Sequence, residues 1–113
     1  MEKIFEQALL YDFYGELLTE HQRNIYEDAV FNDMSLSEIA EEQGISRQGV
    51  HDLVKRCNKT LAGYEEKLKL VQKFNQTRTL VKEIKELAGA YKITGDRRLI
   101  DQIEALSEEI GRL

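Results

Sequence analysis

The stretch "SLSEIAEEQGISRQGVHDLVKR", residues 35–56, carries two short helical patterns separated by a glycine. Ser35 is followed three residues later by Glu38, which is the spacing of a capping box at a helix N-terminus. Gly44 can adopt the positive φ angle that ends a helix, and Ser46 then predicts the cap of a second helix. Helix, tight turn and helix in this order predict a helix-turn-helix motif.

The second helix of this motif has a polar face. On a period of 3.6 residues Val50 and Leu53 point to the core, which leaves six polar positions outside. These six are Ser46, Arg47, Gln48, His51, Asp52 and Lys55. In a helix-turn-helix the second helix enters the DNA major groove, where Arg reads guanine, Gln reads adenine, and Lys and the capping N–H groups hold phosphate. We therefore expect these residues to bind DNA, the alternative being an ordinary solvated helix face.

The charge of the chain opposes free DNA binding. The net charge is −5, and it is unevenly distributed. Residues 1–34 carry two basic and eight acidic side chains, residues 35–60 carry four of each, and residues 61–113 carry ten basic and nine acidic. Local potential at the binding face matters more than the total, but an acidic first third favours dimerisation or a protein partner over non-specific scanning of DNA.

Apolar residues recur at helical spacing along the whole chain, so we expect an all-α fold. The expected helices lie at about residues 2–16, 20–31, 35–43, 47–74, 79–94 and 97–113. The fourth shows heptad spacing from Val50 to Val71, with Gly63 as the expected kink. The polar run "NQTRT", residues 75–79, is expected to end it.

Two parts follow from this pattern: a helix-turn-helix module over residues 1–62 and a C-terminal helical hairpin over residues 63–113, used for packing or dimerisation. The last helix carries an apolar stripe made of Leu99, Ile103, Leu106, Ile110 and Leu113. This stripe must pack on the chain's own long helix or on a second copy. The heptad spacing, together with the two-fold symmetry common among DNA readers, favours a homodimer.

Several classes of protein are excluded. Cys57 is the single cysteine, so no internal disulfide or C-x-x-C metal pair exists, which suits a reducing cytoplasm. No run of eighteen apolar residues is present to span a membrane. His51 and Cys57 lack the spacing and company of metal ligands, and no nucleotide loop or catalytic triad is found. We expect no enzyme, no cofactor, no metal and no small-molecule substrate.

The residues also resemble known families. Residues 18–61 resemble the helix-turn-helix region 4 of bacterial sigma factors. The whole chain is similar to the YlxM family of small bacterial proteins, on "LLYDFYGELLTEHQ" (9–22), on residues 35–56 and on the Y-E-x-K-L pattern at 64–68. The resemblance implies a DNA-binding regulatory protein linked by gene neighbourhood to the signal recognition particle protein and its receptor.

Two other functions stay open at this point. An accessory factor could bind the signal recognition particle protein or RNA, with the helix-turn-helix as a scaffold, and the acidic charge favours this reading. A structural dimer without a nucleic-acid role is the simplest alternative.

Overall fold

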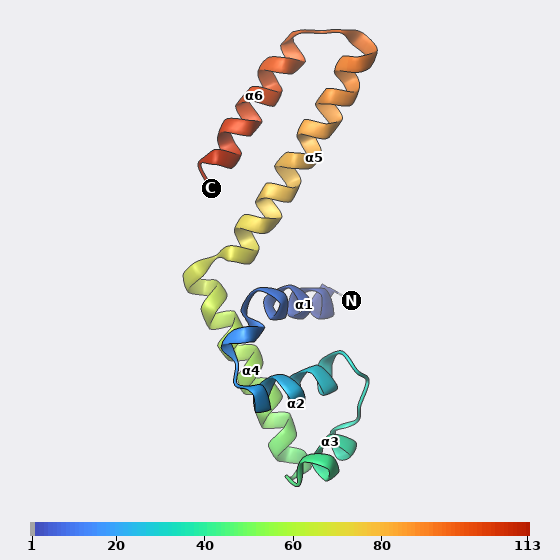
Figure 1. Ribbon diagram of the computed structural model, residues 1–113, viewed down its shortest axis with the longest axis vertical. Coiled ribbons are helices and arrows are strands. Elements are labelled where there is room, and N and C mark those ends of the chain that lie inside the picture. Colours follow the sequence, from blue (N-terminus) through green and yellow to red (C-terminus); the bar gives the residue numbers. More distant parts are fainter. Residues whose placement is uncertain (1) are drawn as a thin grey trace. The chain divides into compact units, whose positions relative to one another are not determined.

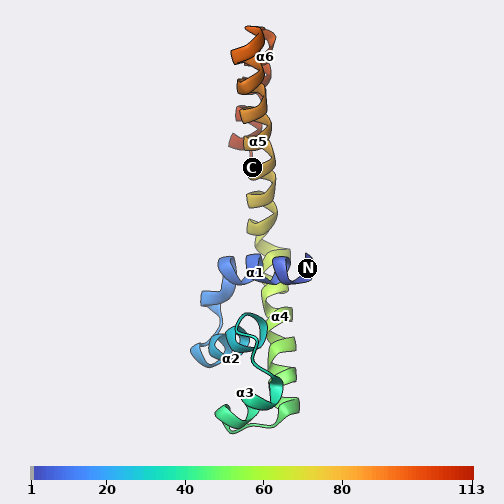
Figure 2. The same ribbon diagram turned by 90° about the vertical axis from the view of Figure 1, so that its right-hand side faces the viewer.

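The computed structural model describes residues 2–113, which are almost entirely helical and contain no strand (Figures 1 and 2). The elements are α1 (Glu2–Tyr14), the 3₁₀ helix η1 (Gly15–Leu17), α2 (Glu20–Val30), α3 (Leu36–Gln43), α4 (Arg47–Leu68), α5 (Leu70–Thr94) and α6 (Arg98–Gly111). This confirms the predicted all-α fold class. None of these helices combines the length and apolar character needed to cross a lipid bilayer.

The chain divides into two compact units between Lys69 and Leu70. The first unit holds α1 to α4 and contains the helix-turn-helix. The second, Leu70–Leu113, holds α5 and α6. The division falls later than residue 62, where the sequence pattern had placed it.

The core of the first unit is built along one edge of α4. Helices α1, α2 and α3 all pack against α4 (Figures 1 and 2). Val50, Cys57 and Leu61 of α4 are completely buried, as are Ile25 of α2 and Ile39 of α3. Burial raises the pKa of the Cys57 thiol, because a low-polarity environment disfavours the thiolate. Cys57 is therefore a core residue, as its place in the heptad pattern predicted.

Two helices of this unit begin with capping boxes, and the one at Ser35 and Glu38 confirms the prediction from the sequence. Thr19 Oγ1 accepts a hydrogen bond from the Gln22 backbone N–H at 3.1 Å, and the Gln22 side chain accepts one from the Thr19 N–H at 2.9 Å. Ser35 and Glu38 form the same reciprocal pair at 3.1 and 3.2 Å. These contacts satisfy N–H groups that lack partners within the helix, and they fix where α2 and α3 start.

A network of polar groups crosses the core between α1, α2 and α4. Tyr26 donates its hydroxyl to Asn58 Oδ1 at 2.6 Å, and Gln7 Nε2 donates to the same oxygen at 3.2 Å. The Tyr26 ring is fully buried and stacks on Tyr11 with 5.5 Å between ring centroids. Burial raises the pKa of Tyr26 to about 12, so its hydroxyl stays a donor throughout the physiological pH range. The sequence pattern did not predict this network.

The long fourth helix differs from expectation in length and in its point of interruption. Helix α4 continues through Gly63 and ends at Leu68, where Lys69 adopts a left-handed conformation with φ 56°. The predicted kink at Gly63 is therefore wrong. A left-handed residue at the end of a helix lets a backbone N–H turn back onto a free carbonyl. Here the Lys69 N–H donates to the Glu65 carbonyl at 2.8 Å.

The polar run at 75–79 does not end a helix but lies inside α5. Thr77 and Thr79 donate their hydroxyls to the carbonyls of Lys73 and Asn75, four residues earlier, at 2.8 and 3.1 Å. These bonds occupy the hydroxyls within the helix, so polar threonines are accommodated without a break. The predicted interruption at this run is therefore wrong.

The heptad residues of α4 are used within the chain. Val50, Cys57 and Leu61 are covered by α1, α2 and α3 of the same unit, and Leu68 is half exposed where the helix ends. The spacing that had favoured a second copy thus reflects packing inside the first unit. It offers no continuous apolar edge of α4 to a partner.

The second unit is an antiparallel pair of helices (Figure 1). Asp96 accepts a hydrogen bond from the Arg98 backbone N–H at 3.0 Å and pairs with the Arg98 guanidinium at 2.8 Å. The Arg98 guanidinium lowers the pKa of the Asp96 carboxyl. Asp96 thus holds the first backbone N–H of α6, although Arg97 occupies the N-cap position, and the apolar stripe of α6 packs on α5.

We expect Tyr26→Phe to destabilise the first unit by about 1 kcal/mol, because it removes the shorter of the two hydrogen bonds to Asn58 Oδ1 and leaves the ring in place. Urea unfolding followed by circular dichroism measures the change. Tyr91→Phe, at an exposed tyrosine of α5, serves as the matched control and should shift stability by less than about 0.5 kcal/mol. Equal effects of the two substitutions would contradict the role of the network.

Candidate nucleic-acid interface

The turn between α3 and α4 has the geometry of a helix-turn-helix. Gly44 ends α3 in a left-handed conformation with φ 68°, a region open to glycine at no steric cost. The backbone N–H groups of Gly44 and Ile45 both donate to the Ala40 carbonyl. Ala40 itself is buried, and its small side chain lets the following helix cross close to α3.

Helix α4 begins at a strong cap. Ser46 Oγ accepts a hydrogen bond from the Gly49 backbone N–H at 2.9 Å. A Cβ at position 49 would lie 3.1 Å from this oxygen, so glycine leaves room for the cap. The inward side of the same turn is anchored by Val50, which packs with Ile25, Ile39 and Ala40. The core therefore fixes the rotation of α4 about its axis, and with it the outward face.

The six residues predicted to bind DNA are all exposed to solvent. The structure places Ser46, Arg47, Gln48, His51, Asp52 and Lys55 at the N-terminal end of α4. Because one helical turn takes 3.6 residues, Arg47, His51 and Lys55 follow one line along the helix and Gln48 and Asp52 follow the next. The first unit thus presents one continuous polar face around the start of α4.

Asp52 organises part of this face. Its Oδ1 accepts a hydrogen bond from Gln48 Nε2 at 3.0 Å and lies 3.6 Å from His51 Nδ1. Both partners are largely exposed, so these contacts position the side chains more than they stabilise the fold. Gln48 keeps its carbonyl oxygen and the second N–H of its amide outside this contact, so it still offers the acceptor and the donor that reading adenine requires.

Lys59 extends the basic part of this face beyond the residues that the sequence analysis selected. It is exposed and lies one turn after Lys55 on the same side of α4. The four-residue spacing between the two lysines was the available signal. Base contacts in helix-turn-helix complexes come from the N-terminal half of the second helix, so Lys59 was not among the residues expected to bind DNA.

Charge in the first unit is divided between helices. Helix α3 carries Glu38, Glu41 and Glu42 with no basic side chain, and the three glutamates line one shallow depression. Helix α4 carries five basic and three acidic side chains. Cations on one helix and anions on its neighbour give the unit a two-sided potential, which orients an approaching polyanion toward α4.

Other site chemistries find no support in the part of the chain that the structure describes. Over residues 2–113 no three His, Cys, Asp or Glu side chains come together in a way that could hold a metal ion. The hollows lined by α5 and α6 are open and contain mainly carboxylates, amides and leucines. The exposed polar face of α4 is therefore the best-defined candidate site.

Two packed helices joined by a left-handed glycine turn, the second with an outward polar face, define a helix-turn-helix protein. Comparison with known families agrees with this class. The chain belongs to the family UPF0122, described as "Putative helix-turn-helix protein, YlxM / p13 like", which it matches over residues 1–103. This confirms the predicted family, and the description names no enzymatic activity.

Two curated relatives align with nearly the whole chain, and a third aligns with about two thirds of it. A UPF0122 protein of Acetivibrio thermocellus is 44% identical over 114 aligned residues, which cover 97% of each chain. A UPF0122 protein of Bacillus cereus is 39% identical over 113 residues, covering 100% of this chain and 98% of the relative. A UPF0122 protein of Caldanaerobacter subterraneus is 53% identical over 79 residues, covering 70% and 68%.

The substitution Ser46→Ala should lower the free energy of unfolding by about 1 kcal/mol, because it leaves the Gly49 N–H without its cap acceptor. Urea titration of the whole chain measures the loss. Ser37→Ala, at an exposed position in the first turn of α3, is the matched control and should leave stability within about 0.5 kcal/mol. A smaller loss for Ser46→Ala than for the control would show that the cap does not hold α4.

Proposed function

We propose that this protein is a cytoplasmic DNA-binding regulatory protein that acts as a homodimer and reads DNA with the start of α4. The observation that carries the proposal is the capped and core-anchored N-terminus of α4, with Arg47, Gln48 and Lys55 exposed on one face. The membership in a helix-turn-helix family supports the same class of function. No catalysis, cofactor or small-molecule substrate is part of the proposal.

Each residue has a role that follows from its chemistry. Arg47 and Gln48 read base edges in the major groove, because their side chains match guanine and adenine in bidentate geometry. Lys55 and His51 lie further along the face and contact phosphate, and Ser46 places backbone N–H groups of the cap beside the phosphate backbone. Asp52 holds Gln48 in the free protein and either accepts from cytosine or releases Gln48 on binding.

The role in the signal recognition particle pathway is supported by the resemblance to the YlxM family. We propose that the regulated genes, or the bound components, belong to that pathway. The alternative function is an accessory factor that binds the particle's protein or RNA. The acidic charge of α1 to α3 favours that alternative, because a protein or a compact RNA contact tolerates nearby carboxylates better than a long DNA site does.

The double substitution Arg47→Ala with Lys55→Ala tests the DNA-reading face. With about four phosphate contacts per protomer, log affinity should fall against log salt with a slope near −4 per protomer. The double variant should bind DNA roughly tenfold to a hundredfold more weakly and reduce the slope by one to two. Fluorescence anisotropy with a labelled duplex at several salt concentrations measures both quantities.

A matched control removes two positive charges from the other unit, with Lys73→Ala and Lys82→Ala in α5. It should change DNA affinity less than threefold, because neither lysine belongs to the exposed polar face of α4 that is proposed to bind DNA. If the α4 variant and the control weaken binding equally, or if neither does, the start of α4 is not the reading face.

The identity of the partner is tested by affinity capture of the tagged protein from a bacterial lysate, with bound nucleic acid sequenced and bound proteins identified together. Enriched duplex sites with a shared two-fold sequence would support the regulator. Enriched particle RNA or protein without DNA would replace it with the accessory factor. Repeating the capture with the Arg47→Ala and Lys55→Ala variant shows whether the partner depends on α4.

A further inference from the structure

The hairpin of α5 and α6 has no second layer to bury its apolar side chains. Within Leu70–Leu113 the structure buries one side chain, Leu80, which is still 9% exposed. The apolar stripe of α6 is only half buried against α5. A unit of two helices is at the lower limit of what forms a self-sufficient core, so apolar surface remains available to a further partner.

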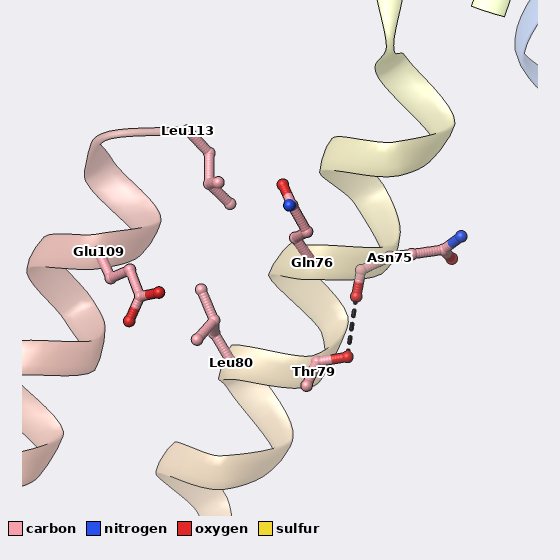
Figure 3. Close-up of a pocket in the computed structure, with 6 residues that line it drawn as sticks. All are labelled: Asn75, Gln76, Thr79, Leu80, Glu109 and Leu113. Carbon is pink, nitrogen blue, oxygen red and sulfur yellow. Dashed lines mark hydrogen bonds between the residues drawn. The ribbon is translucent and has the colours of Figure 1, made fainter.

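The hairpin has two faces, and one of them is grooved and carries carboxylates. Two shallow grooves run between α5 and α6 on this face. The first is lined by Asn75, Gln76, Thr79, Leu80, Glu109 and Leu113 (Figure 3). The second is lined by Glu83, Glu86, Leu87, Gln102, Ala105 and Leu106. Carboxylates and amides make up half of the residues in each lining, with Glu109 at the first groove and Glu83 and Glu86 at the second. A second copy placed on this face would bring these like charges together.

The opposite face is neutral and largely apolar. On α5 it contains Val81, which is 51% exposed, and Ala88 seven residues later. On α6 it contains Ile100, which is 44% exposed, followed by Ser107 and Gly111. Residues seven apart lie on one side of a helix, and small side chains let another helix approach closely. We call these five residues the Val81–Ile100 face.

Charges of opposite sign border this face on its two sides. The outer edge of α5 carries Arg78, Lys85 and Lys92, again seven residues apart and all exposed. The outer edge of α6 carries Asp101, Glu104 and Glu108, also exposed. An apolar strip with a basic edge on one side and an acidic edge on the other is complementary to a second copy of the same strip that is rotated by half a turn.

We propose that the Val81–Ile100 face binds the same face of a second copy of this chain, so that the two hairpins form an antiparallel four-helix bundle. The two-fold axis runs parallel to the helices, which places α5 of each copy beside α6 of the other. Since Leu87 and Leu106 lie at the same level of the hairpin, Lys85 then meets Glu104 and Glu108 of the partner copy. The other face-to-face arrangement places α5 beside α5 and is disfavoured, because like charges would meet.

This interface supplies the homodimer on which the proposed function rests, but its test does not depend on DNA. Sedimentation equilibrium of the full chain at micromolar concentration should show a dimer. Val81→Glu should produce a monomer with unchanged helix content, because a half-exposed position tolerates the charge in the monomer but not in a contact. Gln76→Glu, on the groove face, is the matched control and should remain a dimer.

Charge reversal tests the arrangement of the helices. Lys85→Glu should weaken the dimer about tenfold, because two symmetric pairs become repulsive, and Glu104→Lys should do the same. Combining both substitutions in one chain restores opposite charges across the interface and should recover most of the affinity. Lys82→Glu and Glu109→Lys carry the same changes of charge away from the face and should have little effect.

A monomeric wild-type chain, or a Val81→Glu variant that dimerises normally, would overturn the proposal. Single reversals without effect, or a double variant that does not recover, would overturn the pairing of α5 with α6. If the α4 variant loses DNA binding but remains a dimer, the loss tests the proposed DNA-binding face, and the intact dimer supports an interface outside α4.

Discussion

The first unit depends on the burial of one edge of α4. Val50, Cys57 and Leu61 are completely excluded from water, and each of the other helices in the unit packs on this edge. A helix with one edge fixed in a core cannot rotate, so the opposite edge is fixed as well. The positions of Arg47, Gln48 and Lys55 at the surface are therefore a consequence of apolar packing on the other side of the same helix.

This constraint explains how an acidic chain can carry a cationic face. Within the first unit, nine of the fourteen acidic side chains lie on α1, α2 and α3. Helix α4 has a basic excess, and its N-terminal cap adds the partial positive charge of the helix dipole. Net charge describes the chain in solution, whereas the potential at one helix end describes what it can attract.

Most of the fold could be predicted from the sequence because its signals are local. The capping boxes at Thr19 and Ser35 and the glycine at 44 act within four residues, so spacing alone reveals them. The end of α4 at Lys69 could not be found, because lysine gives no signal for a left-handed conformation. The polar run at 75–79 was misleading for a related reason: Thr77 and Thr79 satisfy their hydroxyls within the helix, and composition does not reveal that.

For the candidate site, the helical period placed the six polar residues outside. The hydrogen bond from Gln48 to Asp52 could not be predicted, because it depends on side-chain conformations that spacing does not give.

Asn58 has a further consequence for how the sequence can change. An apolar edge alone would let α4 slide by one turn against α1 and α2 and still bury comparable surface. The oxygen of Asn58 accepts from both Tyr26 and Gln7, and a slide would strand all three polar groups. The network therefore sets the register of three helices. A substitution at position 58 would leave the buried hydroxyl of Tyr26 and the amide of Gln7 without their shared acceptor.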